Sequence, residues 1–276
     1  MPSNREAYFE AIKQGIPKSI INFALQEVNN FSYLDLAEKF DEEIKDYDLF
    51  ARAISRYQNG EMIEYIFNKS YFLSLPLFVD KSVLIPRQET EELVILSLNY
   101  IRAFFNNNIL NIADVCTGSG AIGLFVAKSL PYSHCYLSDL EKEAIRVAKI
   151  NAENLNIPNT HYLCGDMLKP FIQHGIKLDV LICNPPYIEN EETIDKKTWE
   201  QEPHIALLAK PCTKYYESIF SNLNKVMNDK FLVCLEIGED MEEKLTQLIH
   251  IYCPNCQFQF EKDMYDRTRF LFIKQI

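Results

Sequence analysis

Residues 111–130 read NIADVCTGSGAIGLFVAKSL, a short apolar strand followed by a glycine-containing turn and an apolar helix. The same order recurs down the chain, and it predicts further strands at 134–139, 161–166, 178–184 and 231–238 and helices at 121–130, 142–155, 214–227 and 241–252. Two strand-like pieces, 258–264 and 269–276, follow without a helix between them. We therefore expect an α/β fold with a Rossmann-like, doubly wound, mostly parallel sheet of seven strands, whose C-terminal edge strands are antiparallel.

The first third of the chain follows a different pattern. Apolar residues recur at helical spacing through residues 1–66, and Asn59-Gly60 is a typical helix stop. Residues 67–88 contain two extended segments, punctuated by Pro76 and Pro86. We predict a small N-terminal helical domain at 1–66, a β-hairpin linker at 67–88, and the α/β domain at 89–276, which begins with a helix over 89–105.

The composition is that of a globular protein, with 47% hydrophobic residues and 24% charged residues in 276. Because 28 basic residues face 39 acidic ones, the formal charge is −11, which disfavours direct binding to nucleic acid. No signal peptide or long apolar run is visible, so we expect a cytoplasmic protein without a membrane segment. We also expect a monomer. Cys253 and Cys256 have no second pair of zinc ligands, so we expect no metal.

The turn after the first strand, Asp114–Gly120, has the character of a nucleotide-binding loop. Its glycines allow backbone N–H groups to approach a ligand, and the next helix offers a positive N-terminus. The spacing lacks the full GxGxxG pattern, so a nicotinamide, a flavin or S-adenosylmethionine (SAM) would each be compatible. Asp139 closes the second strand, where it can accept hydrogen bonds from ribose hydroxyls or cap the next helix. Asp166 can bind an adenine amino group while Met167 packs on the ring.

The stretch Asn184-Pro185-Pro186-Tyr187 ends the fourth strand, at the sheet edge where ligands bind in such folds. Two prolines make the turn rigid. The Asn184 side-chain oxygen and the Pro185 carbonyl can then accept both hydrogens of a planar NH₂ group, and the Tyr187 ring can stack on it. A plain proline turn is the simpler alternative reading of this stretch.

Together with the Asp114–Gly120 loop, this stretch resembles class I SAM-dependent methyltransferases that modify planar nitrogens. Three further motifs resemble the bacterial HemK/PrmC family of release factor glutamine methyltransferases: Asn59-Gly60-Glu61 followed by Tyr65 and 72–78, Ile85-Pro86-Arg87 with Glu89-Thr90-Glu91, and Glu202-Pro203 with Ala206-Leu207. The resemblance covers about residues 60–276. The sequence departs from the family at Cys116 and Asp266, where glycine is usual, and at Met62, where proline is usual.

The resemblance implies methyl transfer from SAM, with S-adenosylhomocysteine as product, to the glutamine side-chain amide in the Gly-Gly-Gln motif of class I peptide chain release factors. We further expect the helical domain at 1–66 to bind the release factor away from its glutamine loop. The implied cofactor-binding residues are Asp114, Cys116, Thr117, Gly118, Gly120, Asp139, Leu140, Asp166, Met167 and Asn184. The implied catalytic and substrate-binding residues are Asn184, Pro185, Pro186 and Tyr187, with Glu202 as a further substrate contact. A salt bridge from Glu202 to a lysine is the structural alternative.

Two other functions are compatible with parts of this pattern. A DNA adenine methyltransferase would present the same planar NH₂ group to Asn184, but it must bind phosphates, and the charge of −11 disfavours that. A nucleotide-binding module without catalysis would not need Asn184 or Asp114, and both are present. Residues 189–195 and Trp199 are expected in a loop over the substrate entrance, although a solvated acidic face would explain the acidic run as well.

Overall fold

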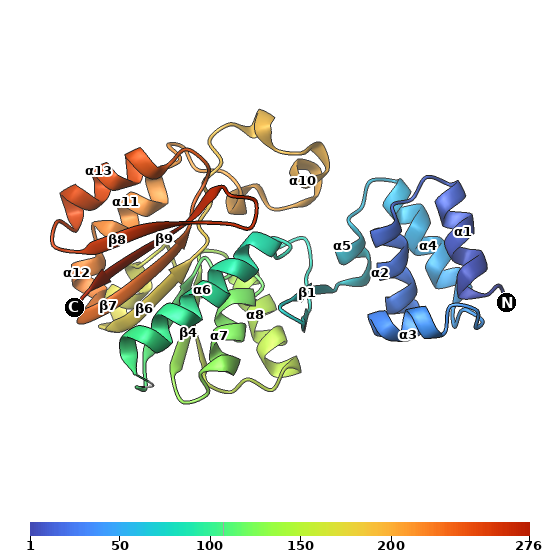
Figure 1. Ribbon diagram of the computed structural model, residues 1–276, viewed down its shortest axis with the longest axis horizontal. Coiled ribbons are helices and arrows are strands. Elements are labelled where there is room, and N and C mark those ends of the chain that lie inside the picture. Colours follow the sequence, from blue (N-terminus) through green and yellow to red (C-terminus); the bar gives the residue numbers. More distant parts are fainter. Residues whose placement is uncertain (107) are drawn as a thin grey trace. The chain divides into compact units, whose positions relative to one another are not determined.

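A computed structural model describes residues 1–106 and 108–276 (Figure 1). The chain divides into two compact units, Met1–Lys69 and Ser70–Ile276. Among the described residues, none of the helices has the length and apolar character of a membrane span.

The first unit is helical, as predicted. Its described residues form the helices α1 (Asn4–Lys13), α2 (Lys18–Asn29), α3 (Tyr33–Glu38), α4 (Tyr47–Gln58) and α5 (Ile63–Phe67). Ser3 and Ser32 each begin a helix with a reciprocal capping box, which satisfies backbone N–H groups that the first turn would leave unpaired. Buried Asn29 bonds to Asn4 at 2.8 Å and so joins α2 to α1 inside an apolar core.

The second unit contains the predicted seven-stranded sheet, in the order β5-β4-β3-β6-β7-β9-β8 across the described residues. The strands are β3 (Asn111–Val115), β4 (His134–Asp139), β5 (Thr160–Cys164), β6 (Leu178–Cys183), β7 (Met227–Glu236), β8 (Gln257–Lys262) and β9 (Thr268–Gln275). The first five are parallel, and β9 and β8 complete the edge as antiparallel strands. The carboxyl ends of β3, β4 and β6 therefore meet at one edge, which is where the predicted ligand loops begin.

Helices cover both faces of this sheet, and alternation along the strands explains how (Figure 1). Ile112 points into a buried cluster under α6 (Gln88–Phe105), α7 (Ala121–Ser129) and α8 (Lys142–Asn154). Its neighbour Ala113 points into the opposite cluster, under α9 (Lys169–His174), α11 (Lys214–Phe220), α12 (Leu223–Val226) and α13 (Glu242–Tyr252). Successive strand residues face opposite sides, so one apolar strand serves two cores.

The structure differs from the sequence prediction in several places. The hairpin, β1 (Ser70–Phe72) and β2 (Leu75–Leu77), belongs to the second unit, because Phe72, Leu75 and Leu77 are buried in the core with α6; the division follows Lys69 and not residue 66. The helix predicted at 214–227 is two helices, α11 and α12. The short helices α9 and α10 (Lys196–Gln201) were not predicted.

Candidate active site

The loop between β3 and α7 is organised around a buried carboxylate. Asp114 is 2% exposed, and its Oδ2 accepts hydrogen bonds from the Thr117 hydroxyl at 2.5 Å and from the Gly123 N–H at 2.8 Å. Burial raises the pKa of Asp114 to about 7, although both hydrogen bonds lower it. Gly120 begins α7 with a φ of 86°, and a Cβ there would lie 3.0 Å from Leu124 Cδ1. These contacts give the loop its shape.

A cavity opens beside this loop, at the carboxyl ends of β3, β4 and β6. Its wall contains most of the residues predicted to bind the cofactor: Cys116, Gly118, Asp139, Leu140, Asp166, Met167 and Asn184. The predicted residues Asp114, Thr117 and Gly120 do not line the cavity. They belong to the loop behind its wall and hold that loop in shape. Ser82, Val83, Leu84, Ser138, Glu141, Ala144 and Ile205 also line the cavity, and the sequence did not single them out.

Asp139 is the acidic centre of this first cavity. Its Oδ2 accepts the Gly118 N–H at 2.9 Å and its Oδ1 accepts the Glu141 N–H at 3.0 Å. Burial raises the pKa of Asp139, and these backbone hydrogen bonds act in the opposite direction. Each carboxylate oxygen retains a lone pair for a ligand hydroxyl. Asp166 forms a 2.7 Å ion pair with Lys169 and also reaches the cavity wall.

A second cavity lies on the other side of the proline turn. Pro185, Tyr187, Arg87 and Glu236 line it together with Ile188, Thr193, Ile194, Asp195, Thr198 and Leu207. The two cavities share Leu84, Asn184, Pro186 and Ala206. A group bound in one cavity can therefore meet a group bound in the other at Asn184, and residues 193–195 lie at the wall of the second cavity, where a loop over the entrance was expected.

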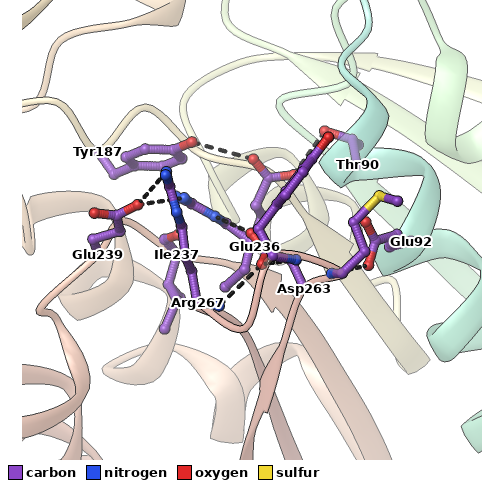
Figure 2. Close-up of polar contacts among 11 residues, drawn as sticks. Thr90, Glu92, Tyr187, Glu236, Ile237, Glu239, Asp263 and Arg267 are labelled. Carbon is purple, nitrogen blue, oxygen red and sulfur yellow. Dashed lines mark hydrogen bonds and ion pairs between the residues drawn. The ribbon is translucent and has the colours of Figure 1, made fainter.

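Asn184 and Tyr187 are held by one buried carboxylate at the end of β7. The Asn184 Nδ2 donates to the Thr90 hydroxyl at 3.0 Å, and Thr90 donates to Glu236 Oε2 at 2.6 Å. Tyr187 donates its hydroxyl to Glu236 Oε1 at 3.2 Å, as Figure 2 shows together with the Thr90 contact. The Tyr187 ring also lies close to the backbone after β7, since a Cβ on Gly238 would come within 3.1 Å of its Cδ2.

Glu202 has a different partner from the lysine considered in the sequence alternative. Its side chain is fully buried and forms an ion pair with Arg87, and it accepts the Ile85 N–H at 3.2 Å. It thus joins the segment before α6 to the loop after β6, and it does not line either cavity. In the same loop Trp199 stacks on His204 with ring centroids 3.5 Å apart.

Thr90 and Glu236 are functional candidates that the sequence analysis did not name as site residues. An acidic residue inside the apolar run FLVCLEIG was the available signal, because a buried strand rarely carries a carboxylate without a purpose. Thr90 was noticed only as part of a motif, since nothing in the sequence shows that α6 begins beside the end of β6.

Comparison with known proteins identifies the family. Residues 98–201 match the methyltransferase small domain family. A release factor glutamine methyltransferase from Mycoplasma mycoides is 33% identical over 264 residues, which cover 93% of this chain and 92% of that protein. This chain belongs to the release factor glutamine methyltransferase family. A member from Bacillus anthracis is 35% identical over 226 residues, covering 81% and 80% of the two chains.

Solved structures agree on the fold. The ribosomal protein L11 methylase of Lactobacillus delbrueckii superposes with a TM-score of 0.51 at 18% identity, over 69% of this chain and 81% of that one. A methyltransferase from Pyrococcus furiosus gives a TM-score of 0.52 at 15% identity, over 82% and 100%. The Rossmann-like prediction is thereby confirmed.

Proposed function

We propose that this protein transfers a methyl group from SAM to the side-chain amide nitrogen of the glutamine in the Gly-Gly-Gln motif of class I release factors. The observation that carries the proposal is the meeting of two cavities at Asn184 and Pro186. One cavity has the lining of a nucleoside site and the other is bordered by the proline turn, so two substrates can approach from opposite sides.

The first cavity fits SAM by the chemistry of its wall. Asp139 and Glu141 offer acceptors for ribose hydroxyls, while Leu84, Met167 and Ile205 offer apolar surface for a purine ring. SAM, when bound, supplies an electrophilic methyl group on a sulfonium. Asp166 remains the candidate acceptor for the adenine amino group.

An amide nitrogen is a poor nucleophile, because its lone pair is delocalised into the carbonyl. Groups at the second cavity can make the nitrogen more reactive. The Asn184 oxygen and the Pro185 carbonyl accept the two N–H bonds of the glutamine amide. Those hydrogen bonds strengthen as positive charge develops on the nitrogen, so they stabilise the transition state more than the ground state. Alignment of nitrogen and methyl group at the shared wall supplies a further advantage through proximity.

Methyl-labelled SAM provides the test. We would incubate the protein with a release factor, with the same factor carrying alanine in place of the loop glutamine, and with duplex DNA. Label should enter the intact factor alone. Label on DNA would support the adenine alternative, and label on the glutamine-less factor would place the methyl group elsewhere; either result refutes the proposal.

We also assign recognition of the release factor to the helical unit Met1–Lys69. The helical unit and the second unit each have their own apolar core. Deletion of the helical unit therefore removes one complete core and leaves the core of the second unit intact. Deletion of 1–69 is expected to raise the KM for the release factor while leaving the Kd for SAM unchanged. Titration calorimetry and initial rates measure the two quantities, and an unchanged KM would contradict the assignment.

A further inference from the structure

We propose that Glu236 is a positioning residue whose carboxylate, acting through Thr90, sets which end of the Asn184 amide faces the substrate and also holds Tyr187 in place. The inference rests on the proposed function, because it concerns how the same site receives a glutamine amide.

The geometry joins three elements that are distant in sequence. Thr90 lies in the first turn of α6, Asn184 follows β6, and Glu236 ends β7. The hydrogen bonds run from Asn184 Nδ2 to Thr90 at 3.0 Å and from Thr90 to Glu236 Oε2 at 2.6 Å. Glu236 is 2% exposed and Thr90 5%, so water does not compete freely for these groups.

The charge of Glu236 sets the direction of this chain of hydrogen bonds. A carboxylate has no proton, so it can only accept, and both Thr90 and Tyr187 must donate to it (Figure 2). The Thr90 hydroxyl then has only lone pairs to offer Asn184. The Asn184 amide must therefore direct its NH₂ to Thr90, which leaves its oxygen for the NH₂ of the incoming glutamine.

The neutral acid would remove this constraint. A protonated Glu236 can donate to Thr90, and Thr90 can then donate to the Asn184 oxygen. The Asn184 amide would turn, and its NH₂ would face the NH₂ of the substrate. Two donors opposed in this way cannot form a hydrogen bond, so the amide contact would be lost.

Burial of the Glu236 carboxylate lowers the stability of the fold, so a structural role alone does not explain it. Among the described residues it makes no ion pair. The nearby Arg269 instead bonds to Glu239 at 3.2 Å and lies 3.6 Å from Asp263. A buried carboxylate that is satisfied by hydroxyl groups, and that lines the substrate cavity, is typical of a functional site.

The surroundings make the charge sensitive near neutral pH. Burial raises the pKa of Glu236 to about 7, and Glu89 of α6 adds to this; hydrogen bonds from Thr90 and Tyr187 and the charge of Arg269 on β9 lower it. Tyr216 of α11 donates its hydroxyl to the backbone carbonyl of Glu236 at 2.8 Å. The productive, ionised form therefore grows as pH rises through about 7.

The kinetic test compares the wild type with Glu236→Gln and Thr90→Val at saturating SAM and release factor, across neutral pH. We expect kcat to fall by about 10- to 100-fold in both variants, because a contact group that is misplaced by about 1 Å lowers the rate by a factor of this size. The wild-type rise of kcat with pH should disappear in Glu236→Gln. The Kd for SAM should not change, and Thr90→Ser, which keeps the hydroxyl, should recover most of the loss. Glu243→Gln, the same change at an exposed position, is the matched control.

A second measurement does not depend on activity. The side-chain NH₂ resonances of Asn184, assigned by their loss in Asn184→Ala, should shift with pH in the wild type and stay constant in Glu236→Gln. Unchanged kcat in Glu236→Gln, or Asn184 resonances that titrate alike in both proteins, would overturn the inference. If the wild type methylated no release factor, the proposed function would fail, and the resonances would still decide the role of Glu236.

Discussion

Asp114→Asn should make the second unit more stable, and by an amount that depends on pH. The carboxylate is 2% exposed, and one of its oxygens, Oδ1, has no hydrogen-bond partner among the described residues. The amide oxygen of asparagine can take over the two hydrogen bonds from Thr117 and Gly123, while the buried charge disappears. The variant thus resembles the protonated form of the wild type.

The magnitude follows from the pKa. Burial raises the pKa of Asp114 from 3.8 to about 7 in the folded protein. The folded wild type therefore binds more protons than the unfolded chain between these values, so its stability falls as pH rises through that window. Each pH unit costs about 1.4 kcal/mol, and the full difference is roughly 4 kcal/mol. The advantage of Asp114→Asn should be small near pH 4 and should level off above pH 7.

Urea unfolding at a series of pH values measures this difference. The single tryptophan, Trp199, lies in the second unit, so its fluorescence reports the unfolding of that unit. Glu236 has no interaction with Asp114 among the causes of its own pKa shift, so its titration cancels in the comparison. Asp229→Asn, at an exposed aspartate of β7, serves as the control and should show no such trend. A difference that does not change with pH, or an Asp114→Asn protein that is less stable at pH 8, would show that burial of the Asp114 charge does not destabilise the fold.

Three further substitutions test other parts of the site. Asn184→Ala should lower kcat by about 100- to 1,000-fold with little effect on the Kd for SAM, in the steady-state assay with release factor. Arg87→Ala should lower the free energy of unfolding in urea by about 3 kcal/mol, because it removes the cation paired with the buried Glu202 carboxylate, and most of that loss should vanish in a Glu202→Gln background. Cys116 has a φ of 60°, so Cys116→Gly should change the free energy of unfolding by less than about 1 kcal/mol, whereas Cys116→Val should destabilise by about 1–3 kcal/mol. Equal stability of the last two variants would contradict a strained backbone there.

The fold was readable because its strands are short apolar runs separated by clear turns. The helix α9 was not predicted because it is only six residues long, with Pro170 near its start. The helix predicted over 214–227 breaks at Ser221 and Asn222, where the Asn222 side chain bonds back to the Ser218 carbonyl at 2.9 Å. Such local competition for backbone groups leaves little trace in apolar periodicity.

The sequence predicted which loops form the site, but it did not predict most of the contacts between their side chains. The motifs located the correct turns, but they could not show that Asp114 faces inward and that Asp139 faces the cavity. The pairing of Glu202 with Arg87 spans 115 residues and depends on tertiary structure. At Cys116 and Asp266, where the family resemblance leads us to expect glycine, both residues adopt a positive φ, so the backbone keeps the conformation that glycine would favour although the side chain differs.

The proposed function places the methyl group on the side-chain nitrogen of one glutamine. Mass spectrometry of a release factor that has been treated with this protein and SAM, digested and fragmented, tests it most directly. We predict a single added methyl group on the glutamine of the Gly-Gly-Gln peptide, formed at least about 100-fold more slowly when Asn184→Ala replaces the wild type. A methyl group on any other residue, or an unmodified loop peptide after complete reaction with SAM, would contradict it.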